Sequence, residues 1–433
     1  MAAHDLQTRL VETFHRWQHD GDNLPWSPQH PLRHRAIAAF QRLGFPTTRH
    51  EDWKYTSIAP LLRPAYRLTP PPPLEPTALL HRFPALEGLP TPHVWLLNGL
   101  PVIARLPEQV QCWSFLQNPE GHPSFGSLLP LEDEAFVALN TAFAPDAAFV
   151  SLSGDLPDEV LHVAIVTTAE TEPQLAHPRL WLRIEPNAHR RVLVSFHSLG
   201  THPGLTNAAA ELLVGPGAHL ELVVWETDVT TAYLITTFSA LLEQHARLGV
   251  WHVALGGAVT RNNLYIRLAG SGADAQLFGA MMVEGQQIID HCTLVEHRVE
   301  QCTSNQLYKS VADDQGTITF SGRIHVYPGA QKTNAYQSHR AVLLSEKATV
   351  NARPQLEIYA DDVRCTHGAT TGSLDEGALF YLRCRGIPHA EARALLLQAF
   401  LTEAISSLPD EVVRNRAEAV LEGWAHRTAE VTP

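Results

Sequence analysis

Short runs of β-branched and other apolar residues fill the middle of the chain, from about residue 147 to residue 372. Gly, Pro, Asn and Asp interrupt these runs, and no long helical period appears among them. Near the end of the region, residues 356–360 (LEIYA) alternate apolar with polar side chains, a period of two that is typical of a strand. The pattern therefore predicts a central region built mainly of β-strands.

A turn, an alanine and an alternating strand recur at a nearly constant interval in this region. The alanines are 30, 28 and 27 residues apart: Ala188, Ala218, Ala246 and Ala273. Ala330 follows 57 residues later, whereas Ala348 breaks the interval. Units of this length favour a solenoid in which each coil buries its face on its neighbours. A β-sandwich stays open as an alternative, although it would need strands roughly every 8–12 residues and no longer period.

Helical spacing of apolar residues is found towards the two ends of the chain. It predicts helices over 6–19, 34–43 and 131–143, then a helix opened by the capping-box pattern Ser373/Glu376, and helices over 388–408 and 409–427. Asn98-Gly99 predicts a β-hairpin. The proline-rich segment 69–76 predicts an extended spacer. We expect an N-terminal, mainly helical region (1–146) with a Pro-rich linker and short strands, a β core (147–372) and a C-terminal helical region (373–433).

Composition narrows the classes of function. The 433 residues are 45% hydrophobic, and their net charge is −13, which argues against nucleic acid or an anionic membrane as the main partner. The N-terminus has no apolar core of signal-peptide type, and no stretch is long and apolar enough to cross a bilayer. We therefore expect a cytoplasmic protein. Its five widely spaced cysteines form neither a disulfide framework nor a zinc-finger pattern.

Residues 361–368 (DDVRCTHG) bring acidic, basic, thiol and imidazole side chains together in one short segment. If the strand over 356–360 continues, Asp361, Val363, Cys365 and His367 project from one face. A thiol and an imidazole two residues apart are soft, metal-compatible ligands, but a bound metal or cluster would need further ligands from elsewhere. A core thiol beside a histidine at the strand end is the alternative that these residues alone favour.

A second group of soft ligands is Asp290-His291-Cys292 with His297 and Cys302. In a strand, Asp290 and Cys292 share one face, so we interpret the group as packing between coils plus one exposed histidine, with a sulfur-transfer or metal role as the lesser alternative. There is no GxxxxGK[ST], GxSxG or HExxH sequence. We therefore expect no nucleotide site and no independent hydrolase activity.

Three stretches resemble the SufB/SufD family of the SUF iron–sulfur cluster assembly system: RHEDWKYTSIAPLL, YPGAQKTNAYQSHRAVLLSEKATVNARPQLEIYADD, and DDVRCTHGAT followed by LDEGALFYLRCRGI. The chain follows the SufD pattern at two places where SufB differs, Gln337-Ser338 and residues 365–370. The resemblance implies a mainly β protein, a right-handed parallel β-helix core flanked by N-terminal and C-terminal helical regions.

The resemblance also implies that the chain is a non-catalytic scaffold subunit in a complex with a SufB-like paralogue and a SufC-like ATPase. His367, with Cys365 beside it, would contact iron of a nascent, transient iron–sulfur cluster at the SufB interface, and the C-terminal helices would dock SufC. The exposed sheet edge near the end of the β-helix would pair with SufB, and the isolated chain could pair with itself through that edge. No nucleic acid or membrane partner is implied.

Two alternatives belong to other classes of function. β-Helices often serve enzymes that act on polysaccharides, which need paired carboxylates in a groove. The candidates are Asp361-Asp362 and Asp313-Asp314, although adjacent strand residues point to opposite faces. The second alternative is a purely structural adaptor without cluster ligands, and burial of both Cys365 and His367 away from any subunit edge would favour it.

Overall fold

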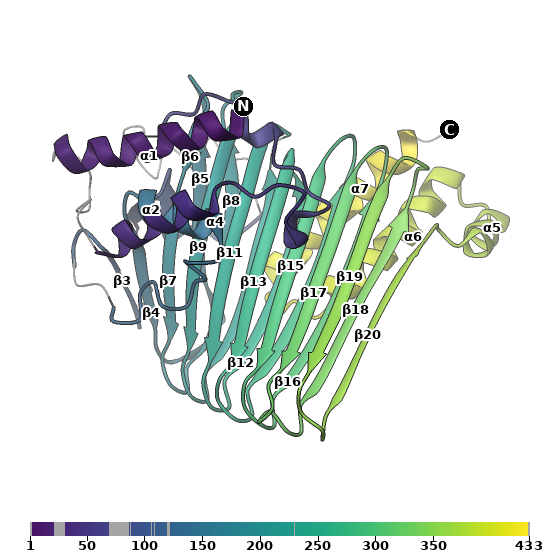
Figure 1. Ribbon diagram of the computed structural model, residues 1–433. Helices are drawn as coiled ribbons and strands as arrows, with labels where there is room; N and C mark the ends of the chain where they lie inside the picture. Colours follow the sequence, from purple (N-terminus) through teal and green to yellow (C-terminus); the bar gives the residue numbers. More distant parts are fainter. Residues whose placement is uncertain are drawn as a thin grey trace.

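The computed structural model describes residues 2–20, 31–68, 86, 88–104, 106–107, 109–118, 122–228 and 230–431. The predicted proline-rich spacer 69–76 lies outside these residues. The protein is mainly β, and its centre is a parallel β-solenoid of about eight turns (Figure 1). Helices stand at both ends of the chain, which confirms the fold class that the sequence predicts.

Two ten-stranded sheets form the solenoid. The sheet that faces the C-terminal helices, here called the C-side sheet, has the order β2 (Leu100–Ile103), β1 (Val94–Leu97), β5 (Asp155–Thr168), β8 (His189–Leu199), β10 (His219–Asp228), β12 (Arg247–Gly256), β14 (Asp274–Val283), β16 (Thr303–Ala312), β18 (Asn334–Leu343) and β20 (Arg364–Gly372). The opposite N-side sheet has the order β19 (Thr349–Ile358), β17 (Thr317–Val326), β15 (Ile288–His297), β13 (Val259–Leu268), β11 (Ala232–Leu242), β9 (Gly204–Val214), β7 (Arg179–Ile184), β4 (Ala148–Leu152) and β3 (Val110–Ser114), with β6 (Gln174–Ala176) paired to β9.

The chain alternates between the sheets and adds one strand to each per coil. From β8 onward the register along the C-side sheet is continuous, and His189, His219, Arg247 and Asp274 lie side by side. The predicted alanines occupy the turn just before each of these strands and are buried. Cys302 holds the next such position, Ala330 lies in a longer turn before β18, and Ala348 breaks the interval because it lies in the opposite set of turns, between β18 and β19.

Each of these tight turns places one residue in the left-handed region, which Gly and Asn enter at low cost. These residues are Asn187 (φ 59), Gly217 (φ 67), His245 (φ 56) and Gly272 (φ 74). The amide of the left-handed residue donates to a carbonyl in the turn of the next coil, as from Asn187 to Pro216 and from Gly217 to Gln244. The turns therefore stack as regularly as the strands do.

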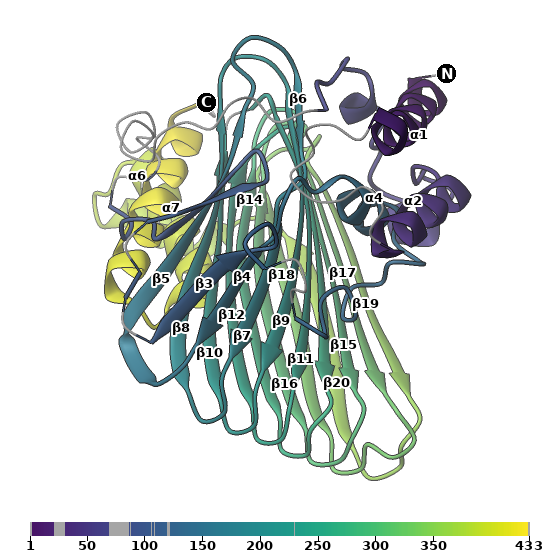
Figure 2. The same cartoon turned by 90° about the vertical axis from the view of Figure 1, so that its left-hand side faces the viewer.

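Helices cover the outer faces of both sheets (Figure 2). On the N-side sheet, α1 (Ala2–Asp20), α2 (Pro31–Leu43), α4 (Ala135–Phe143) and the 3-10 turns η1 (Glu51–Trp53) and η2 (Pro60–Leu62) pack around side chains such as Leu205, Ile235 and Val259. On the C-side sheet, α6 (His389–Ile405) and α7 (Glu411–Val431) cover Trp225, Trp251 and Met282. None of the described helices has the length and apolar character that crossing a bilayer requires.

Several local expectations can be compared with the structure. The hairpin is confirmed, since β1 and β2 pair antiparallel around Asn98 and Gly99, both with positive φ. The helix after the solenoid, α5 (Glu376–Cys384), is capped by Asp375, whose carboxylate accepts from the amides of residues 377 and 378; Ser373 is not the cap. The strand over 356–360 does not continue to His367, because the chain turns between Ile358 and Arg364.

Candidate functional site

The last coil of the solenoid leaves an open end. In the described chain, β20 pairs only with β18, and β19 pairs only with β17, so one edge of each strand is unpaired. Figure 1 shows β20 as the last strand of its sheet. Most of its residues are exposed, unlike those of β18. Gly368 and Gly372 lie on this strand, and a Cβ added at either would meet no other atom within 4 Å. An accessible edge with free backbone groups is a template for pairing with another chain.

Cys365 and His367 both lie on β20, two residues apart. Their register partners on β18 are Ala335 and Gln337, which are buried inside the solenoid, so the two side chains lie on the side of β20 that continues this interior. Cys365 is half-buried against Ile324, Val326 and Ala335, and burial raises the pKa of its thiol. His367 is exposed. The pair therefore sits at the edge of the molecule, contrary to the condition that would favour the purely structural adaptor.

A polar interior lies directly behind this pair. Gln337 crosses the space between the sheets towards Gly322, where a Cβ would come within 1.4 Å of the Gln337 amide nitrogen. Among the described residues, neither polar atom of the Gln337 side chain has a hydrogen-bond partner. One step further along β18, His339 bonds Ser310 Oγ at 2.8 Å through Nε2 and stacks on Phe320. Burial lowers the pKa of His339 to about 4, so this imidazole is neutral near pH 7.

Large apolar side chains surround the open end. Tyr336, Ile358 and Tyr359 border the last coil with exposed fractions of 41%, 39% and 60%, and Phe380 and Tyr381 on α5 reach 68% and 56%. Aromatic residues of this kind are enriched in the buried centres of protein interfaces. The end of the solenoid and the start of the C-terminal helices thus have the character of a surface that a partner covers.

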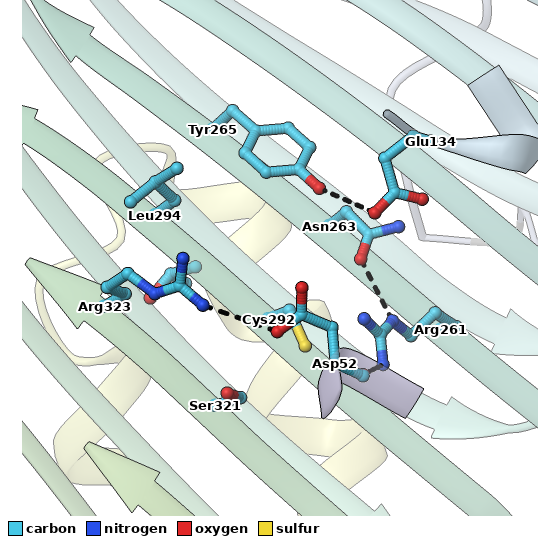
Figure 3. A pocket seen from close by; sticks show the side chains of 10 residues that line it. Asp52, Glu134, Arg261, Asn263, Tyr265, Cys292, Leu294, Ser321 and Arg323 are labelled. Atoms are coloured by element: carbon cyan, nitrogen blue, oxygen red, sulfur yellow. Dashed lines mark hydrogen bonds and ion pairs between the residues drawn. The ribbon is translucent and has the colours of Figure 1, made fainter. Parts of the chain in front are cut away.

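Two members of the second predicted group, Asp290 and Cys292, lie on the outer face of the N-side sheet, under residues 50–57, here called the N-terminal arm. Figure 3 shows Cys292 in this place. Arg261 and Asp290 form a buried ion pair at 2.5 Å, and Asp290 also accepts from Thr56 Oγ1 at 2.5 Å. Arg261 stacks over Trp53 at 4.2 Å and donates to the Asp52 carbonyl at 2.7 Å. These contacts hold the segment HEDWKYTS against the solenoid, so it acts as an anchor for the N-terminal region.

A small cavity of about 50 Å³ adjoins this anchor. Tyr265 donates to Glu134 at 3.2 Å, and Arg323 reaches Asp52 at 3.4 Å across it (Figure 3). Burial raises the pKa of Glu134 and of the Cys292 thiol, which favours their neutral forms. A protonated thiol is a poor metal ligand. The arrangement is therefore better suited to holding the arm than to binding iron.

The interpretation of residues 290–302 is partly confirmed. Asp290 and Cys292 do share a face, and the Cys292 thiol lies 3.5 Å from Asp290 Oδ1. The expected exposed histidine is wrong, because His291 and His297 are both fully buried between the sheets. Alternation alone could not distinguish an interior face from a solvent face, since both faces of this sheet are covered. The links from Arg261 and Thr56 to Asp290 were missed because 29 and 234 residues separate the partners.

The acidic pairs proposed for a polysaccharide enzyme are parts of turns. Asp313 Oδ1 accepts from the amide of Asp314, and Asp314 Oδ2 accepts from the amide of Gly285 in the neighbouring coil. Asp361 and Asp362 are exposed in the turn before β20. Asp314 is thus used in holding adjacent coils together, which leaves little support for a pair of catalytic carboxylates there.

Fold and site together define a parallel β-solenoid subunit whose open edge presents a thiol and an imidazole among exposed aromatic residues. Comparison with known families agrees with this class. The model described as SUF system FeS cluster assembly, SufBD core domain, matches residues 165–400, and the model for the SufBD protein N-terminal region matches residues 26–160. The chain belongs to the SufBD family of the SUF iron–sulfur cluster assembly system.

Individual relatives extend the match over nearly the whole chain. The iron–sulfur cluster assembly protein SufD of Escherichia coli is 28% identical over 420 residues, which cover 93% of this chain and 95% of the relative. A SufBD family protein of Synechocystis is 28% identical over 388 residues, 85% of this chain and 84% of the relative. One from Mycobacterium tuberculosis is 31% identical over 270 residues, covering 60% and 66%. SufD-like scaffolds of iron–sulfur cluster assembly are thus the proteins that this chain resembles.

Proposed function

We propose that this chain is the SufD-like scaffold subunit of a SufBCD complex and supports de novo cluster assembly at an interface with SufB. The observation that carries the proposal is the open edge at β20, which displays His367 and Cys365 next to unpaired backbone groups. β20 contains no proline, so nothing in its backbone prevents another strand from pairing along it.

His367 and Cys365 are proposed as ligands of the nascent cluster, which is the cargo of the assembly. Imidazole nitrogen and thiolate sulfur both suit iron. The described residues place no third His, Cys, Asp or Glu ligand atom with these two. A site shared between subunits accounts for that, because the paralogue would provide the missing ligands. It would also let relative movement of the two subunits open and close the site.

The C-terminal helices are proposed to dock the SufC ATPase. Besides Phe380 and Tyr381 on α5, Leu395 on α6 and Val412 on α7 are exposed to 41% and 54%. ATP hydrolysis would belong to SufC, so this chain acts as a non-catalytic subunit. In the absence of its paralogue, the β20 edge could pair with that of a second copy.

Co-purification tests these assignments. The chain is expressed with its SufB and SufC counterparts and purified anaerobically with iron, a sulfide source and ATP, and the cluster absorbance is compared with that of a His367→Ala variant. Thr366→Ala is the matched control, because Thr366 is an exposed neighbour on the opposite face of the same strand. We expect all three complexes to assemble and only His367→Ala to lose the cluster.

The other outcomes separate the two parts of the proposal. A complex of normal composition whose absorbance does not depend on His367 would retain the scaffold role and eliminate the ligand role. Failure of the wild-type chain to associate with SufB or SufC would overturn the scaffold assignment itself. Loss of the cluster in both variants would show that the edge, rather than the imidazole, is what matters.

A further inference from the structure

Two imidazoles and a carboxylate converge on the outer face of the C-side sheet, far from β20. His189 and His219 are the first residues of β8 and β10 and are direct register partners, and Glu221 follows two residues later on the same face as His219. One ligand atom from each of the three lies within 4.8 Å of the others, the one such group of three among the residues that the structure describes. We propose that His189, His219 and Glu221 bind a divalent transition-metal ion.

The donor atoms are available and close together. His189 Nε2 is buried, has no hydrogen-bond partner in the described part of the chain, and lies 3.5 Å from Glu221 Oε2. His219 Nε2 lies 4.0 Å from Glu221 Oε1. An orphaned nitrogen aimed at a carboxylate is costly unless something satisfies it. Ligand atoms around a tetrahedral ion with bonds of about 2.0–2.2 Å are roughly 3.3–3.6 Å apart, which is close to the spacing of these donor atoms.

Neighbouring charged groups orient these ligands as an outer shell of a metal site does. Arg191 Nε donates to Glu221 Oε2 at 2.7 Å, which fixes the carboxylate and leaves Oε1 free on the side of His219. His189 Nδ1 faces Asp155 Oδ1 at 3.8 Å, a position that favours the tautomer with the lone pair on Nε2. Carboxylate contacts of this kind commonly set the tautomer and basicity of metal-bound histidine.

The charged groups next to the two imidazoles are balanced in number. Asp155 and Glu221 face them, and Arg191 and Arg247 lie beside them, a net charge of 2 − 2 = 0.

The arrangement of the two imidazoles also shows what binding would change. The rings are stacked, with centroids 4.2 Å apart and planes 18° from parallel. An ion cannot lie in the planes of two stacked rings at once, so at least one ring must rotate about its Cβ–Cγ bond to share it. Both side chains are about one-third exposed, at 29% and 31%, which leaves room for that rotation.

The donor set indicates the class of metal. Two imidazoles and one carboxylate suit Zn²⁺ and the neighbouring first-row ions, and three protein ligands leave at least one position open to water or an incoming ligand. The same set is found around Fe²⁺ in non-haem sites. Five strand spacings of about 4.8 Å separate β10 from β20, roughly 24 Å, so this site is distinct from the one proposed at His367.

Metal titration of the full-length chain tests the proposal independently of cluster assembly. Metal-free protein is titrated with Co²⁺ and Zn²⁺, and anaerobically with Fe²⁺, and compared with a His189→Ala/His219→Ala double variant and with Glu221→Gln. His202→Ala is the matched control, an exposed histidine outside the group. Co²⁺ d–d bands without thiolate charge transfer would distinguish this nitrogen and oxygen site from metal bound to cysteines.

We expect the wild-type chain and His202→Ala to bind one equivalent of Co²⁺ or Zn²⁺ that the double variant does not bind. Glu221→Gln, which retains an acceptor for Arg191, should bind about tenfold more weakly or worse. Displacement of Co²⁺ by Fe²⁺ would extend the site to iron, and displacement by Zn²⁺ alone would restrict it to the zinc class. Equal stoichiometry and affinity in the wild type and both variants would overturn the proposal.

Discussion

Glu226 provides a quantitative test of the solenoid interior. It lies between the sheets with an exposed fraction of 3%, and one of its oxygens accepts from Asn262 Nδ2 at 2.7 Å. The other oxygen has no partner among the residues that the structure describes. Burial raises the pKa of this carboxyl group from 4.5 to about 8. The folded protein therefore holds a proton here at pH values where the unfolded chain has released it.

The sign and size of the effect follow from proton linkage. Because the folded state binds the extra proton, stability is highest below the unfolded pKa and falls as the pH rises from about 4.5 to about 8. At about 1.4 kcal/mol per pH unit the total is about 5 kcal/mol. An unfolding entropy of about 2.1 cal/mol/K per residue, or about 0.9 kcal/mol/K for 433 residues, converts this into about 5 °C in Tm.

Glu226→Gln imitates the protonated side chain and does not titrate. We expect the Tm of the variant minus that of the wild type to rise by about 4 °C between pH 5 and pH 9, because the first part of the titration lies below pH 5. Taking this difference cancels the buried histidines, which titrate alike in both proteins. Glu346→Gln, at an exposed position, is the control and should give a flat difference. A difference for Glu226→Gln that changes by less than about 1 °C would refute the reasoning.

Three further predictions concern stability. Glu211→Ala leaves Arg179 buried without its ion-pair partner at 2.7 Å and should cost roughly 3–5 kcal/mol in urea unfolding. Trp53→Ala should cost about 3–5 kcal/mol and make the N-terminal arm cleavable in limited proteolysis, whereas Tyr55→Ala, at 38% exposure, should leave cleavage unchanged. Burial lowers the pKa of His252 from 6.5 to about 3, so the folded protein loses stability as the pH falls below 6.5. His252→Phe should therefore reduce the decrease of Tm between pH 7 and pH 4. An unchanged dependence of Tm on pH in this variant would contradict the prediction.

The repeat was predictable because solenoid coils impose the same demands at the same interval. A small residue is needed where the turn enters the next strand, and four alanines occupy this position at intervals of 27–30 residues. The interval alone does not reveal whether an alanine lies in a turn that leads into the C-side sheet or in one that leads into the N-side sheet. Ala348 broke the pattern for that reason, since it belongs to turns on the opposite side.

The candidate site was predictable only as far as local sequence reaches. Alternation placed Cys365 and His367 on one face, and the resemblance to the family drew attention to them. Their exposure depends on β20 having no further coil beyond it, which sequence spacing does not reveal. The group of His189, His219 and Glu221 was missed because its histidines are one full coil apart, and only the register of β8 and β10 makes them neighbours.

The two ends of the solenoid are unequal. At the first end the outermost strands are short and antiparallel to their neighbours, and Pro101 lies in β2, so the sheets end there in edges that a further strand cannot easily extend. At the other end β20 is nine residues long, and no strand of the described chain pairs with its outer side. A solenoid that can pair through one end only forms a dimer and no larger assembly, whereas one that can pair through both ends polymerises into fibres. The first end, which resists strand pairing, therefore limits the self-association of a protein with an exposed sheet edge.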